Sequence, residues 1–96
     1  MAEQEKVNDL FLSLLFSLSA AAMQQMGKIA NPITNKIEKN LEQTKVSIDL
    51  IAMLLEKTKG NLTEEENKIL TSTLSDLQLN YVDELEKDSK AEHRAN

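Results

Sequence analysis

The residues that could carry chemistry are few and far apart in this chain. The only histidine is His93, in the polar C-terminal stretch, and there is no cysteine. A histidine-based triad, an HExxH zinc motif and a thiolate metal site are therefore excluded from the rest of the chain. Ser13 and Ser17 have no base near them in the sequence, so we interpret them as small contacts between helices. From these residues we expect no catalytic group, no metal, no cofactor and no small-molecule substrate.

Two charged runs could be mistaken for ligand sites. Three consecutive helical residues point about 100° apart, so Glu64, Glu65 and Glu66 do not converge on a metal ion. Their charges instead favour the positive end of a helix. The run from Lys57 to Asn61 places lysines beside a turn, but it lacks the spacing of a phosphate-binding loop. We interpret this run as a helix end and a tight turn.

One charged residue interrupts an apolar segment. Asp49 lies within Ile48-Asp49-Leu50-Ile51, and Lys45 precedes it by four residues. On a helix surface these two side chains can form an ion pair. If Asp49 is buried against Lys45 and the hydroxyl of Tyr81, the three residues form a polar site instead. Both interpretations stay open at this point.

Length, charge and composition favour a single small helical domain. The 96 residues suffice for one domain, and two glycines and one proline are too few for the turns of a β-sandwich or barrel. The net charge of −5 and the three aromatic residues disfavour nucleic-acid binding. The leader MAEQEK lacks the basic character of a signal peptide, which favours a cytoplasmic location.

Start and stop signals predict an all-α fold with three helices. The helices are expected at about residues 6–26, 37–58 and 63–86, within one domain spanning 1–86. The polar residues 87–96 are expected to be a disordered tail. The second helix can begin near Ile37 or at Asn40, which forms a weak capping box with Gln43. The caps and turns that define these helices are predicted at Gly27, Pro32, Gly60, Asn61, Thr63 and Glu66.

The apolar faces exceed what one short chain can cover. Between residues 10 and 23, 11 of 14 residues are apolar, and the second helix is apolar on two sides. We therefore predict a homodimer or tetramer in which helices two and three form a hairpin. The strongly apolar first helix packs across this hairpin and across a second copy. The expected interface residues are Phe11, Leu12, Leu15, Phe16, Leu18, Ala22, Met26, Leu50, Met53 and Leu54.

The turn between the second and third helices also carries a family resemblance. The run from Glu56 to Glu66, EKTKGNLTEEE, resembles the signature of a small bacterial helical family, domain of unknown function 1844. The similarity covers about residues 11–82. Asn40, Thr44 and Gln78 depart from the family's usual Asp, Ala and Arg. The resemblance implies a small cytoplasmic bacterial protein without an established activity, and it supplies no catalytic residues.

These observations favour a non-enzymatic interaction and assembly module over two alternatives. The module would associate with itself through helix one, and an unidentified protein is a further partner to consider. The first alternative is a peripheral membrane protein that uses helix one, although its 14-residue apolar run is shorter than the roughly 20 residues of a membrane span. The second alternative is an enzyme of unknown type, which the scarcity of site-forming residues disfavours.

Overall fold

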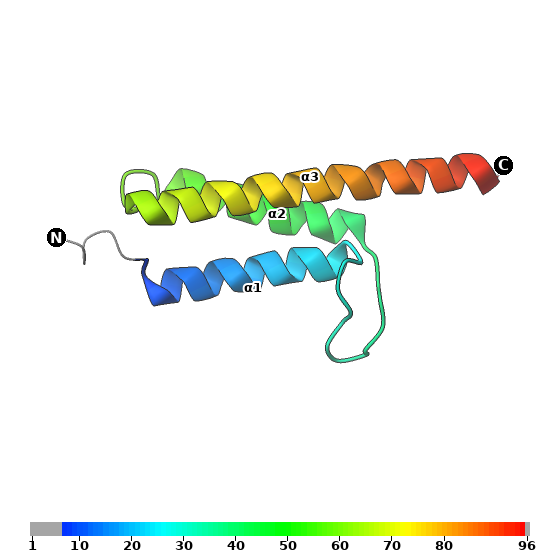
Figure 1. Cartoon of the computed structure of the whole chain (residues 1–96), viewed down its shortest axis with the longest axis horizontal. Helices are drawn as coiled ribbons and strands as arrows, with labels where there is room; N and C mark the ends of the chain where they lie inside the picture. Colours follow the sequence, from blue (N-terminus) through cyan, green and yellow to red (C-terminus); the bar gives the residue numbers. More distant parts are fainter. Residues whose placement is uncertain (1–6, 96) are drawn as a thin grey trace.

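The fold is an all-α arrangement of three helices. The computed structural model describes residues 7–95, with side chains up to residue 91, and within this range there is no β-strand. The helices are α1 (Asp9–Gln25), α2 (Leu41–Lys57) and α3 (Glu64–Ala95). Figure 1 shows them side by side with their long axes nearly aligned, and α3 extends beyond the ends of the other two. A long connection between α1 and α2 projects away from the helices.

Helix α1 is bounded by a polar cap and a glycine. The side chain of Asn8 accepts hydrogen bonds from the backbone N–H groups of Leu10 and Phe11, at 2.9 and 3.0 Å. The helix therefore begins at Asp9, three residues later than the sequence indicated. At the other end Met26 is the C-cap, and Gly27 adopts a φ of +84°, a left-handed conformation that glycine reaches without strain.

Helix α2 begins at the later of its two predicted starts. The side chain of Asn40 accepts a hydrogen bond from the N–H of Gln43, and the helix begins at Leu41. Residues 37–39 are not helical. Backbone hydrogen bonds hold the chain in a non-helical path on either side of them, from the Asn31 N–H to the carbonyl of Lys36 and from the Asn40 N–H to the carbonyl of Gln25.

Helix α3 extends much further than expected. The sequence predicted its end near residue 86 and a disordered tail over 87–96, but the helix continues to Ala95. Charge pairs support the first residues of this extension. Lys87 pairs along the helix with Asp83 and Glu84, and Lys39 from the connection reaches Asp88.

The core lies where the three helices meet and is small. Its fully buried apolar side chains come from every helix: Leu15, Ala22, Met26, Ile48, Ile51, Leu70 and Leu77. Two polar side chains of α2 are buried with partners, because Thr44 donates to the carbonyl of Asn40 and Ser47 donates to Gln25. None of the described helices is both long and apolar enough to cross a membrane.

Candidate functional site

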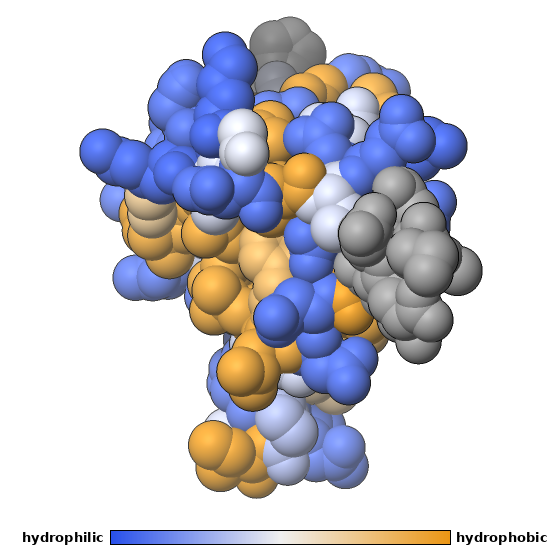
Figure 2. All heavy atoms as spheres, turned by 90° about the vertical axis from the view of Figure 1, so that its left-hand side faces the viewer, coloured by the Kyte–Doolittle hydropathy of each residue, from blue (hydrophilic) through white to orange (hydrophobic). Residues whose placement is uncertain are grey.

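A group of exposed apolar side chains lies on one side of α1 and α2. We call it the α1–α2 face. Each of its members is between 41 and 82% exposed: Leu10, Leu14, Val46, Leu50 and Met53. Figure 2, which looks at the end where α1 begins, shows apolar side chains gathered in one area with hydrophilic side chains around it.

A hydrogen bond between the two helices shows that both halves of this face lie at the same edge. Ser47 Oγ donates to Oε1 of Gln25 at 2.7 Å. Leu14 shares a stripe of α1 with Gln25, since the two residues are eleven apart, and Leu50 follows Ser47 by one turn of α2. Because α1 and α2 run antiparallel (Figure 1), both leucines border the same outer seam between the helices.

Three of the predicted interface residues are not available to a partner. Leu15, Ala22 and Met26 are at most 1% exposed, because they point into the core of their own chain. The prediction of these three residues as interface residues is therefore wrong. Helix α1 is apolar around most of its circumference, so helical projection alone could not decide which side meets α2 and α3.

The other seven predicted interface residues divide into two groups. Phe16, Leu50 and Met53 are exposed, and Phe16 lies on the opposite side of α1 from Leu14. The remaining four are half-buried: Phe11, Leu12, Leu18 and Leu54. Of these, Phe11 and Leu18 pack against the core. Sequence reasoning missed Leu10, Leu14 and Val46. Their spacing could have identified them, because Leu10 precedes Leu14, and Val46 precedes Leu50, by one helical turn, which places each pair on one side of its helix.

The predicted polar site in α2 is a surface ion pair. Lys45 Nζ lies 3.0 Å from Oδ2 of Asp49, and the two side chains are 63 and 62% exposed. The hydrogen bond to Asp49 raises the pKa of Lys45 above its ordinary value. Tyr81 is half-buried against the core. The interpretation that needs a buried Asp49 is therefore corrected, and an exposed pair of this kind stabilises a fold very little.

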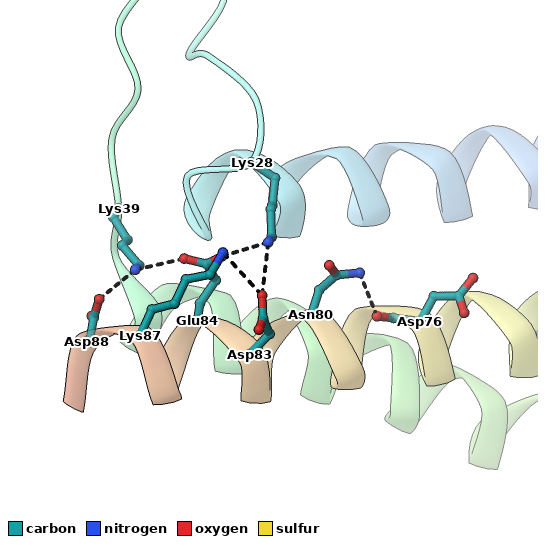
Figure 3. Close-up of polar contacts among 8 residues, drawn as sticks. All are labelled: Lys28, Lys39, Asp76, Asn80, Asp83, Glu84, Lys87 and Asp88. Carbon is teal, nitrogen blue, oxygen red and sulfur yellow. Dashed lines mark hydrogen bonds and ion pairs between the residues drawn. The ribbon is translucent and has the colours of Figure 1, made fainter. Parts of the chain in front are cut away.

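The densest charge cluster joins the ends of the α1–α2 connection to α3. Glu84 is buried, and its two carboxylate oxygens accept from different lysines (Figure 3). Lys28 Nζ lies 2.6 Å from Oε2, and Lys39 Nζ lies 2.8 Å from Oε1. Lys87 approaches Oε2 to 3.2 Å from the next turn of the same helix. We call Glu84 with Lys28 and Lys39 the Glu84 clamp, because it ties both ends of the connection to α3.

This cluster sets the ionisation of its members. The hydrogen bonds from Lys28 and then Lys39 lower the pKa of Glu84 from 4.5 to about 2, against a smaller opposing effect of burial. The hydrogen bonds of Lys39 to Asp88 and to Glu84 raise its pKa in turn. Asp83 has a lowered pKa, chiefly through its hydrogen bond with Lys87. These shifts favour the charged forms of Glu84, Asp83 and Lys39, and the cluster acts as a structural clamp. Sequence analysis missed it because its members lie up to 60 positions apart.

Glu66 caps two helices at once. Its Oε1 accepts from the N–H of Thr63 at 2.9 Å, while the Thr63 hydroxyl accepts from the N–H of Glu66 at 3.1 Å. Its Oε2 accepts from the N–H of Asn8 at 2.7 Å, at the start of α1. These backbone hydrogen bonds lower the pKa of Glu66. The capping box was visible in the sequence, but the link to α1 was not.

The turn that carries the family resemblance borders a groove. Gly60 adopts a φ of +86°, and Asn61 beside it is exposed. Pro32, the predicted turn residue between α1 and α2, is exposed as well. A hollow of about 580 Å³ lies between the end of α2 and the start of α3, lined by apolar and polar side chains. The hydroxyls of Thr58 and Thr71 in its lining donate to carbonyls of their own helices. Both hydroxyl protons are therefore engaged within their own helices.

No metal centre is formed by the described part of the chain. Within it, no group of three or more carboxylate or imidazole side chains is placed to hold an ion. The side chain of His93 lies outside the described residues.

Comparisons with known proteins give one match. A family model described as "Domain of unknown function (DUF1844)" matches residues 9–83, a range that covers α1, α2 and α3 as far as Asp83. No curated protein and no solved structure matches the chain.

Proposed function

Because the chain belongs to the DUF1844 family, whose description gives no activity, we propose a function from its surfaces. We propose that the protein is a non-enzymatic assembly module. In this proposal two copies form a symmetric dimer by burying the α1–α2 face of each copy against the same face of the other. A two-fold axis suits such an interface, since one self-complementary patch then serves both copies.

The uncharged apolar character of the α1–α2 face carries this proposal. Complete burial of one leucine or methionine contributes about 1.5–3 kcal/mol, so the exposed fractions of the five side chains represent about 4–8 kcal/mol per copy. Two copies together offer about twice that amount. Association itself costs about 4–15 kcal/mol, so the face can support a stable dimer.

Small residues on α1 favour a close approach of two copies. Ser17 is exposed and Ala21 is half-buried, and both lie on the side of α1 that carries Leu14. Short side chains at a helix contact let the backbones come near each other, which increases van der Waals contact between the larger side chains around them.

The two alternatives have less support. A bilayer would need the apolar surface of α1, but α1 uses Leu15, Ala22 and Met26 in its own core. An enzyme would need a converging set of reactive groups, and the cluster around Glu84 consists of mutually paired charges. We therefore propose neither a small-molecule substrate nor a nucleic acid as partner, and we retain the cytoplasm as the proposed location.

The proposal is tested by the mass of the protein in solution. We expect light scattering on 10.8 kDa chains to give twice or four times that mass at micromolar concentration. The double variant Leu14→Glu/Leu50→Glu should lower the mass while circular dichroism still reports helix, because both side chains are exposed. The matched control is Val82→Glu, which changes a comparably exposed residue of α3. A wild-type mass of one chain, or an unchanged mass in the double variant, refutes the proposal.

A further inference from the structure

The connection between α1 and α2 presents isoleucines to solvent. We call residues 26–40 the arm. Its isoleucines Ile29, Ile33 and Ile37 are 44, 91 and 64% exposed. Connections of about this length without a helix or strand are uncommon in compact domains, where they are usually functional loops or linkers. An apolar side chain at the tip of a projecting segment (Figure 1) contributes nothing to the core of its own chain.

The arm nevertheless has a defined conformation. Asn31 Oδ1 accepts from the N–H of Ile33 at 2.8 Å, and Asn31 Nδ2 donates to Glu38 at 2.9 Å. The backbone N–H of Asn31 also reaches the carbonyl of Lys36 at 2.8 Å. The Glu84 clamp fixes the base of the arm (Figure 3). A segment held in this way has already lost its conformational entropy, so docking it costs less than ordering a flexible loop.

A groove of complementary character lies between α1 and α3. It measures about 460 Å³ and is lined by Ser19 and Met23 from α1 and by α3 residues that include Asp76, Leu79 and Asp83. Leu79 is 70% exposed. Phe16, also exposed, precedes Ser19 by one turn on the same side of α1. The groove therefore combines apolar side chains with carboxylates.

The charges of arm and groove are opposite. The arm carries three lysines and one glutamate, a net charge of +2, whereas residues 61–96 carry four basic and nine acidic residues, a net charge of −5. Lys28 and Lys39 are engaged by the Glu84 clamp, so Lys36 is the cation of the arm that remains for a partner. Among the ion pairs of the described residues, none includes Asp76 at the groove.

We propose that the arm of one copy docks into the α1–α3 groove of a second copy, with Ile33 against Leu79 and Met23 and with Lys36 paired to Asp76. This inference rests on the proposed self-association and adds a second contact to it. The α1–α2 face forms the dimer, and reciprocal exchange of arms joins two dimers into a tetramer. A lipid surface is a less favourable binding partner for the arm, because an anionic bilayer would repel a chain of net charge −5.

A charge exchange tests the pairing directly. Light scattering should give four times the chain mass for the wild type. Lys36→Glu and Asp76→Lys should each raise the tetramer–dimer dissociation constant at least about tenfold, because each places like charges opposite one another. The double variant Lys36→Glu/Asp76→Lys should restore the tetramer. Both residues are exposed, so circular dichroism should be unchanged throughout.

A second pair of variants separates this inference from the proposed function. Ile33→Asp should leave a dimer held by the α1–α2 face, whereas Leu14→Glu/Leu50→Glu should leave a dimer held by the arms. If the arm variants leave the mass unchanged while the leucine variants lower it, the arm inference is wrong and the dimer stands. If only the arm variants lower the mass, the α1–α2 dimer is wrong and the arm contact stands. Ile33-dependent cosedimentation with phosphatidylglycerol vesicles, without a tetramer, would assign the arm to lipid and overturn its docking to a second copy.

Discussion

Glu84 is the residue at which both ends of the arm are tied to α3, and its neutralisation is the sharpest test of the Glu84 clamp. Glu84→Gln keeps the size of the side chain but removes the charge that Lys28 and Lys39 share at 2.6 and 2.8 Å. Three ammonium groups, including Lys87, then lose a buried counter-charge. We expect the variant to fold, because no core apolar contact is lost, and to be less stable.

The size of the effect follows from the pKa of Glu84. A lowering from 4.5 to about 2 corresponds to about 3 kcal/mol of preferential stabilisation of the charged form. The lysine side chains are partly solvated, so screening reduces the contribution to the free energy of unfolding to about 1–2 kcal/mol. For a domain of this size, that predicts a thermal midpoint about 5–15 °C lower at pH 7.

The pH dependence identifies the cause. A carboxylate with a lowered folded-state pKa contributes stability that is fully present above its unfolded pKa of 4.5 and is lost as the pH falls towards about 2. The wild type should therefore lose its advantage over Glu84→Gln progressively between pH 4.5 and pH 2. Urea unfolding monitored by circular dichroism, at one protein concentration, measures the free-energy difference at each pH. A constant difference across this range would refute the electrostatic clamp.

The matched control is Glu86→Gln, which neutralises an exposed carboxylate two residues further along the same helix. It should change the free energy of unfolding by less than about 0.5 kcal/mol at every pH. An effect of Glu86→Gln as large as that of Glu84→Gln would mean that the helix responds to its total charge and not to the Glu84 clamp.

Two further substitutions test the helix ends. Gly60→Ala should lower the free energy of unfolding by about 1–2 kcal/mol in urea unfolding, because the φ of Gly60 is +86° and a Cβ added there would meet no atom within 4 Å. Gly60→Asn should lower the free energy of unfolding by less, and equal losses in the two variants would mean that backbone strain is not the cause. Glu66→Gln should lower the thermal midpoint more than Glu65→Gln does. Asn8 and Thr63 donate to different carboxylate oxygens of Glu66, and the amide NH2 group that replaces one of these oxygens cannot accept a hydrogen bond. Equal shifts in the two variants would show that the double cap contributes nothing.

Local signals in the sequence predicted much of the fold. The number of helices, the Asn40 cap and the Thr63–Glu66 box depend on residues within three or four positions of each other, where side-chain chemistry determines the backbone bonds. The left-handed glycines were predictable for the same reason, since few other residues adopt the required φ.

The candidate sites depended on contacts that no local pattern reveals. The Glu84 clamp joins residues more than forty positions apart. Lys39 of this clamp also pairs with Asp88, which lies in the segment that was expected to be disordered. The sequence was equally unable to predict which residues of α1 lie in the core and which lie on the surface. Nothing within an all-round apolar helix distinguishes Leu15 from Leu14, and only the positions of α2 and α3 bury the first and expose the second.

The division of α1 explains how so short a chain can have both a core and an exposed apolar face. One side of α1 places Leu15, Ala22 and Met26 among the other helices, and the adjacent side carries Leu14 at the seam with α2. The hydrogen bond between Gln25 and Ser47 lies along that seam, where a polar pair has a defined geometry and fixes how α1 is rotated against α2. A rotation of α1 by one residue position would exchange Leu14 with Leu15 and break this bond. The polar pair therefore supports the orientation of α1 that buries Leu15 and exposes Leu14.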